Sequence, residues 1–127
     1  MTKPRRWIGR WLLGVGILHT LLGFGTYIFS VVEILRAGLW NTVASVQGRP
    51  EAVWFIAAGL QLILLGALAN WIEARGPGEP LPRFLGWTLL GFAILGAVLI
   101  PISGFWLLVP PAVGILLRRE APPSPAG

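Results

Sequence analysis

Two long apolar stretches set the strongest limit on how this chain can fold. Residues 8–29 and 52–72 contain few polar side chains, and each is long enough for one helix to cross the roughly 30 Å hydrocarbon core of a bilayer. At that depth the backbone has to satisfy its own hydrogen bonds, which a helix does. Two shorter stretches, residues 84–100 and 101–117, reach the lower length limit of a membrane span. The sequence therefore predicts an all-α protein, an integral membrane four-helix bundle.

The distribution of charge supports this class and predicts an orientation. Only 12% of the residues are charged, against roughly 25% in soluble domains. The basic residues that give the net charge of +5 flank the apolar stretches and form no face interleaved with aromatics, so nucleic acid is not an expected partner. Most of them lie at the two termini and in the loop at 75–83, whereas Arg36 and Arg49 lie on the other side. The positive-inside rule then predicts a multi-pass protein of the bacterial inner (plasma) membrane, with both termini in the cytoplasm.

The length allows a single domain, residues 1–119, and the Pro-rich tail at 120–127 is expected to be disordered. The chain has no cysteine, which excludes thiolate chemistry and disulfides, and its single histidine gives weak support for a metal site unless two protomers contribute, as haem would require. It also has no nucleotide-binding, zinc-protease or Ser-His-Asp motif. No cofactor or metal is therefore expected.

The segment between the first two spans, residues 31–49, is too polar to cross a membrane. Five aliphatic residues in it recur on one helical face at mostly four-residue steps: Val31, Leu35, Leu39, Val43 and Val46. Glu33 and Arg36 are three residues apart and are expected to pair on the other face. These spacings predict an amphipathic interfacial segment at the outer membrane surface. The alternative is a frayed extension of the first helix.

His19 is the only histidine and lies near the middle of the first span, while Gln61 lies near the middle of the second. If the two helices are antiparallel neighbours, these side chains meet at one depth, where an imidazole needs a polar partner. Gln61 is therefore the expected partner of His19. Steps of three and four residues give a small or polar stripe along the first helix: His19, Gly23, Thr26, Ser30 and Glu33. The stripe either packs against other helices, with His19 in a structural hydrogen bond, or lines a wet cleft that holds a ligand.

Several other residues are candidates for the outer mouth of such a cleft. Glu33 and Glu51 are the only acids on the outer side, and two carboxylates in different environments can share acid and base roles. Together with His19 they are the candidate catalytic residues. The candidate ligand-binding residues are Gln61, Thr26, Tyr27, Trp54, Trp106 and Ser103. Simpler roles stay open, with Glu51 beside the dipole of the second helix and the aromatic residues as interfacial anchors.

The fourth apolar stretch carries signals of a helix boundary. Ser103 is expected to cap its N-terminus. Pro110 and Pro111 lack the N–H groups that would bond carbonyls near residues 106 and 107, so those carbonyls are expected to be free. In lipid they need a neighbouring group or water. The proline pair therefore indicates either a packing kink or a bend over a polar pocket.

Three segments resemble one protein family: RWIGRWLLGVGILHTLLG at the N-terminus, AVWFIAAGLQLILLGALANW in the second span, and LPRFLGW with LIPISGFWLLVPPAVGILL at the end. The family comprises small bacterial four-helix membrane proteins and is described only as a domain of unknown function. The resemblance covers nearly the whole chain and implies a four-span bundle without an established activity. Small multidrug-resistance transporters share the size and span count, but they carry a glutamate in the first helix, where this chain has His19. DoxX-like proteins are a looser comparison of similar size.

These observations lead to one functional hypothesis and three alternatives. The hypothesis is that the protein binds a lipophilic small molecule in an intramembrane polar pocket centred on His19 and Gln61. The alternatives are a cofactor-free isomerase or cyclase acting on a lipid-like substrate, an accessory subunit of a membrane complex, and a small proton-coupled transporter. The expected partners are the lipid bilayer, the lipophilic molecule, and either a second copy of the chain or another membrane protein.

Overall fold

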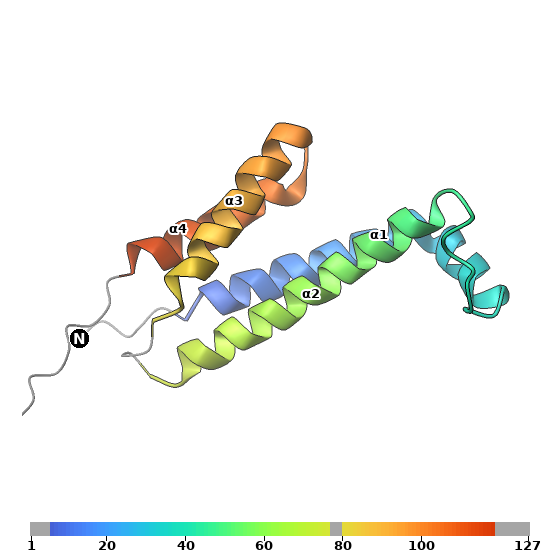
Figure 1. The fold of residues 1–127 in the computed structure, drawn as a ribbon. Helices are drawn as coiled ribbons and strands as arrows, with labels where there is room; N and C mark the ends of the chain where they lie inside the picture. Colours follow the sequence, from blue (N-terminus) through green and yellow to red (C-terminus); the bar gives the residue numbers. More distant parts are fainter. Residues whose placement is uncertain (1–5, 77–79, 119–127) are drawn as a thin grey trace, which may run out of the picture. The chain divides into compact units, whose positions relative to one another are not determined.

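The computed structural model describes residues 6–76 and 80–118, and these residues form helices joined by turns, with no strand among them (Figure 1). The elements are α1 (Ile8–Arg36), α2 (Arg49–Ala74), α3 (Arg83–Leu99), the short 3-10 helix η1 (Gly104–Leu108) and α4 (Val109–Leu117). The predicted all-α class with four helices is confirmed. The tail that was expected to be disordered, residues 120–127, lies outside the described residues.

The chain divides into two compact units, and α1 and α2 each run through both. The hairpin unit comprises residues 13–65, with most of α1, the connection that follows it, and most of α2. The terminal unit comprises residues 1–12 and 66–127, with the start of α1, the end of α2, and all of α3, η1 and α4. Each unit has packing contacts of its own.

Within the hairpin unit, α1 and α2 run side by side in opposite directions and meet at glycines (Figure 1). A Cβ atom on Gly16 would lie 2.6 Å from the backbone nitrogen of Ile63, closer than Cβ atoms come to other atoms in proteins. Gly59 lies against the hydroxyl group and the backbone of Thr20. Small residues let helix backbones approach this closely, which increases van der Waals contact. The register of 16 with 63 and 20 with 59 then fixes which residues of the two helices share a level.

α1 has a bend in its C-terminal half. Tyr27 has non-helical backbone angles, φ −110° and ψ 20°, so α1 consists of two helical segments joined at this residue. Gly23 and Gly25 precede the bend, and each glycine lowers helix stability by about 1 kcal/mol relative to alanine. The helix is therefore weakest where it changes direction.

The end of α1 is a Schellman motif, and it corrects the prediction for the segment that follows. Gly38 has a φ of 89°, its N–H donates to the carbonyl of Leu35, and the N–H of Leu39 donates to the carbonyl of Ile34. Residues 31–36 therefore extend α1, while residues 37–48 form turns. The predicted amphipathic helical face is wrong beyond Arg36, because Gly38 adopts the left-handed conformation that ends a helix.

In the terminal unit, α3 and α4 form a second antiparallel pair, with η1 at the turn between them (Figure 1). α3 buries four residues spaced three and four apart: Gly86, Leu89, Ala93 and Gly96. The ring of Phe105 in η1 lies against Gly96, and the side chain of Leu116 in α4 lies against Gly86. The glycines of α3 thus make room for side chains of the following segment.

The helix surfaces are strongly apolar. α1 and α2 are long and apolar enough to cross a membrane, whereas α3 and the segment Gly104–Leu117 are apolar but shorter. Large side chains exposed on α3 are Phe84, Trp87, Phe92, Ile94, Leu95, Val98 and Leu99. Thr88 is the only polar side chain between Phe84 and Leu99, so α3 has no polar face. A helix that is apolar on every side is typical of one covered by protein or lipid.

Candidate functional site

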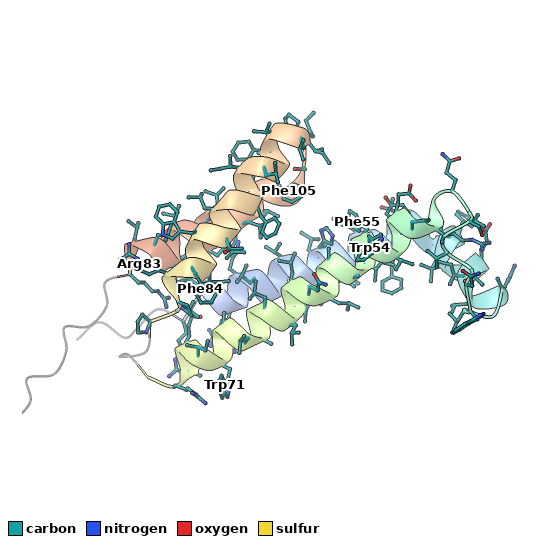
Figure 2. All side chains as sticks on the ribbon, viewed as in Figure 1. Trp54, Phe55, Trp71, Arg83, Phe84 and Phe105 are labelled. Carbon is teal, nitrogen blue, oxygen red and sulfur yellow. The ribbon has the colours of Figure 1, made fainter. Side chains whose placement is uncertain are left out.

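His19 and Phe55 form the centre of the candidate site, which lies in the hairpin unit. The imidazole ring stacks on the Phe55 ring, with 4.0 Å between centroids and 11° between planes. The Phe55 ring occupies the space beside Gly23, where a Cβ atom would lie 2.8 Å from it, and Tyr27 contacts it at a centroid distance of 5.6 Å. Phe55 of α2 (Figure 2) therefore packs on two rings of α1 that lie about two turns apart.

The hydrogen bond of His19 determines which ring nitrogen carries a proton. Its Nε2 atom lies 3.1 Å from the backbone oxygen of Phe55. A carbonyl oxygen only accepts, so Nε2 is the donor. In the neutral ring Nδ1 then keeps a lone pair, and no group among the described residues donates to it. The site thus has one ring nitrogen in use and one available to a ligand.

Gln61, the expected partner of His19, is exposed and forms no hydrogen bond with it. The register of α1 and α2 puts Gln61 close to the level of His19, but Gly59 is the residue that faces α1 there. Two further residues rotate a helix by roughly 200°, which turns Gln61 to the opposite side. The predicted pairing is therefore wrong, because equal depth does not give two side chains a common face.

The small and polar stripe of α1 packs against α2 and the connection over much of its length. The Phe55 ring fills the position beside Gly23, and the hydroxyl oxygen of Ser30 lies 3.9 Å from where a Cβ on Gly48 would be. The stripe therefore contacts α2 at Gly23 and the connection near Ser30. His19 is the member of the stripe that hydrogen-bonds to the backbone of α2.

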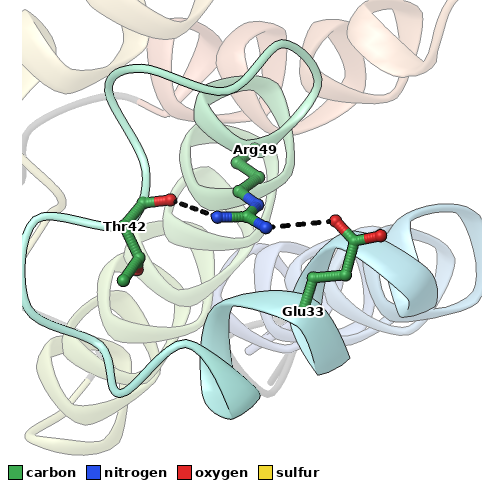
Figure 3. Close-up of polar contacts among 3 residues, drawn as sticks. All are labelled: Glu33, Thr42 and Arg49. Carbon is green, nitrogen blue, oxygen red and sulfur yellow. Dashed lines mark hydrogen bonds and ion pairs between the residues drawn. The ribbon is translucent and has the colours of Figure 1, made fainter.

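Glu33 pairs with Arg49 and not with Arg36 as predicted (Figure 3). Nη2 of Arg49 lies 3.3 Å from Glu33 Oε2, and its Nη1 donates to the carbonyl oxygen of Thr42 at 2.7 Å. One guanidinium therefore ties α1, the connection and the start of α2 together. The three-residue spacing of Glu33 and Arg36 predicted the wrong partner, because the connection brings Arg49 next to the Glu33 carboxylate.

The three candidate catalytic residues do not form a hydrogen-bonded group. His19 and Glu33 are 14 residues apart on α1, which corresponds to roughly 20 Å at the helical rise of 1.5 Å per residue. Glu51 is exposed in the first turn of α2, where a carboxylate interacts favourably with the helix dipole. Neither carboxylate bonds to the imidazole.

Among the other ligand-binding candidates of the hairpin unit, Tyr27 belongs to the aromatic cluster around Phe55. Thr26 and Trp54 are both exposed, and Trp54 directly precedes Phe55 on α2 (Figure 2). Tyr27 is thus the candidate that contacts the same Phe55 ring as the imidazole.

Ser103 and Trp106 belong to the terminal unit. Ser103 Oγ accepts the backbone N–H of Phe105 at 3.4 Å, so it caps η1, which leads into α4. The predicted cap is therefore confirmed. The indole N–H of Trp106 donates to the carbonyl oxygen of Pro101 at 2.9 Å. Both polar groups are used within their own turn.

Pro110 and Pro111 lie at the start of α4, so they begin a helix and do not kink one. Two carbonyls were expected to be free, but the backbone N–H of Val109 bonds to Trp106 O. Leu107 O accepts the indole N–H of Trp11 at 2.8 Å. In the terminal unit, Trp11 thus satisfies a backbone group that the prolines leave without a helical partner.

A family model described as a family of unknown function (DUF6463) matches residues 3–122. The chain belongs to this family. The predicted membership of a family of unknown function is therefore confirmed. No curated protein and no solved structure matches the chain.

In this DUF6463 member, Glu73 is the one buried charged residue among the described residues, and sequence reasoning did not single it out. Its Oε1 atom lies 2.7 Å from Arg118 Nη2, and its Oε2 accepts the backbone N–H of Gly9 at 2.9 Å. That N–H belongs to the first turn of α1 and has no partner within the helix. The sequence offered one signal, a seven-residue spacing along α2 that leads from the small residues Ala52, Gly59 and Gly66 to Glu73. The structure buries all four.

Proposed function

We propose that this protein crosses the bacterial inner membrane four times and has both termini in the cytoplasm. The length of α1 and α2 and the all-round apolar surface of α3 support this location. The 17 residues of α3 lie at the lower end of the length needed for a span. Trp40, in the connection between α1 and α2, is 92% exposed, which is typical of an anchor at a membrane–water interface.

We further propose that the protein binds a lipophilic small molecule at His19. The observation that carries this proposal is that only one ring nitrogen of His19 is hydrogen-bonded: Nε2 bonds to Phe55 O, and Nδ1 has no partner among the described residues. A polar group left unpaired in hydrocarbon costs roughly 1–3 kcal/mol or more. An apolar ligand with one hydroxyl or N–H group removes that cost by donating to Nδ1. The stacked rings of His19 and Phe55 offer such a ligand an apolar wall.

The catalytic alternative has less support. A cofactor-free isomerase or cyclase needs a second proton-transferring group beside His19, and neither Glu33 nor Glu51 bonds to the imidazole. No specific contact favours an accessory-subunit role or proton-coupled transport. Ligand binding is therefore the function that the geometry supports best.

Native mass spectrometry of the protein purified in mild detergent tests the proposal through two variants of His19. In His19→Gln the side-chain amide reaches the position of Nε2 and can still donate to Phe55 O, but the Nδ1 acceptor is lost. In His19→Ala both interactions are lost. We expect the wild type to retain a lipophilic molecule, His19→Gln to lose it while unfolding within a few degrees of the wild type, and His19→Ala to lose both ligand and stability.

Gln61→Ala is the matched control, because Gln61 lies at a similar depth on a different face of α2. It should retain the ligand to the same extent as the wild type. Retention of the ligand by His19→Gln, or a wild type that carries no lipophilic molecule, would contradict the proposed function.

A further inference from the structure

Four helix ends meet at one end of the terminal unit. Glu73, near the end of α2, accepts the N–H of Gly9 at the start of α1 and pairs with Arg118 directly after α4. Nη2 of Arg6 lies 3.4 Å from the carbonyl oxygen of Ala74, the last residue of α2. The start of α1, the end of α2 and the end of α4 are therefore neighbours.

The start of α3 comes to the same end. Leu116, near the end of α4, lies against Gly86 in the first turn of α3. Each of the four helices therefore has an arginine within it or next to it in this region, which we call the arginine end: Arg6, Arg10, Arg75, Arg83 and Arg118. These residues are far apart in the sequence, and the packing of the terminal unit brings them together.

The arginine end carries positive charge that no exposed carboxylate of the described residues balances. In the terminal unit, Glu73 is the carboxylate that the structure describes, and its side chain is buried and already bound to Arg118 and to Gly9. Arg10 and Arg83 are exposed. Neither guanidinium pairs with a carboxylate among the described residues.

Exposed aromatic residues accompany these arginines. Trp71 lies near the end of α2, and Phe84 follows Arg83 at the start of α3 (Figure 2). The guanidinium carbon of Arg75 lies 3.5 Å from the centroid of the Trp71 ring. Tryptophan is enriched at the depth of lipid headgroups, so the charge and the aromatic rings point to the same environment.

We infer that the arginine end binds the phosphate groups of anionic phospholipids in the leaflet that it faces. A guanidinium matches a phosphate through two parallel hydrogen bonds, and several arginines at one helix bundle end can hold one headgroup between them. Clustered basic residues at the cytoplasmic surface are attracted to anionic lipid, and the attraction falls with ionic strength. The inference rests on the membrane location proposed above, but it is independent of ligand binding at His19.

The test is thermal unfolding of the purified chain in a neutral detergent, with short-chain phosphatidylglycerol or phosphatidylcholine added in steps. We expect phosphatidylglycerol to raise the unfolding temperature in a saturable manner and phosphatidylcholine to raise it much less. In the double variant Arg10→Gln/Arg83→Gln, the phosphatidylglycerol concentration for half the shift should rise roughly 25-fold, about fivefold for each arginine. The shift should also shrink in 0.5 M salt.

Arg36→Gln in the hairpin unit is the matched control, since it removes an exposed arginine outside the arginine end. It should keep the wild-type response to phosphatidylglycerol. Comparing the two lipids within each variant separates lipid binding from any general loss of stability.

Three outcomes would overturn the inference. These are an equal response to both lipids, an equal loss of response in Arg36→Gln, and a full response to inorganic phosphate alone, which would indicate a small-anion site. A wild-type response to phosphatidylglycerol in His19→Gln would show that the arginine end works even if the proposed ligand site fails.

Discussion

The terminal and hairpin units each join their helices with an ion pair, but they bury those pairs to very different extents. In the terminal unit, the side chain of Glu73 is 1% exposed and bonds to Arg118 and to the backbone of α1. In the hairpin unit, the side chain of Glu33 is 59% exposed and meets Arg49 at a longer distance. Exposed pairs contribute little because water screens them, whereas breaking a buried pair leaves an uncompensated charge. Removing the carboxylate of the ion pair should therefore lower the free energy of unfolding far more in the terminal unit than in the hairpin unit.

Glycines make two kinds of close contact in this fold. Gly16 in the hairpin unit lies against the backbone of Ile63, and Gly9 in the terminal unit lies against the backbone of Asn70. In the α3–α4 pair, Gly86 and Gly96 lie against the side chains of Leu116 and Phe105. A helix backbone cannot move without its neighbours. Gly9 and Gly16 should therefore tolerate substitution poorly.

Glu73→Ala should give the largest effect of the variants that test this comparison. It removes one partner of Arg118 and the acceptor of the Gly9 N–H, so we expect a loss of about 3 kcal/mol in the free energy of unfolding, at the low end for a buried pair because Arg118 is partly exposed. Glu73→Gln keeps an acceptor for the Gly9 N–H and should lose less. Denaturant titration of the detergent-solubilised protein measures both. A loss below 1 kcal/mol in Glu73→Ala would remove the difference between the units.

Gly16→Ala should cost about 1–3 kcal/mol, because its methyl group has to displace the backbone of α2 at Ile63. Gly14→Ala is the matched control on the same helix, since nothing lies within 4 Å of the position where its Cβ would be. The control should be neutral or stabilise by up to about 1 kcal/mol through helix propensity. Gly96→Ala should also destabilise, because its methyl group would overlap the near end of the Phe105 side chain, which rotation of the ring does not move. Equal losses at Gly14 and Gly16 would contradict the close approach of the two backbones.

Trp11→Phe should cost about 1 kcal/mol, since it keeps an aromatic ring but removes the donor to Leu107 O. The carbonyl that Pro111 leaves without its helical partner would then be unpaired. Trp87→Phe is the control, because Trp87 is exposed on α3. Thermal unfolding of the two variants side by side measures the difference, and a null result for Trp11→Phe would show that the carbonyl finds another donor.

Glu33→Gln should have the smallest effect, below about 1 kcal/mol, because its carboxylate is largely exposed. Glu51→Gln, in the first turn of α2, provides an unpaired reference carboxylate on the same unit. The two variants should unfold at nearly the same temperature. A loss in Glu33→Gln as large as that in Glu73→Ala would show that the ion pair of the hairpin unit is buried in its native surroundings.

The sequence predicted the elements of this fold because apolar length and helix-boundary residues act locally. It identified four helical regions, the cap at Ser103 and, of the two carbonyls expected to lack a helical partner, that of Leu107. It failed where a partner comes from far along the chain, as with Glu33 and Arg49. It failed again at Gly38, because four-residue spacing of aliphatic side chains carries no information on the backbone angles of the residues between them.

The candidate site shows the same division between local and tertiary information. That His19 would sit in an apolar helix and need a hydrogen-bond partner follows from the sequence alone, since an imidazole in such surroundings is costly to leave unpaired. Its partner, the carbonyl of Phe55, could not be predicted, because every residue has a carbonyl and only the approach of α1 to α2 at Gly23 selects this one. Burial of Glu73 and the gathering of five arginines likewise depend on which helix ends meet. The sequence determined where apolar helices form, and the tertiary structure decided which polar groups they bring into contact.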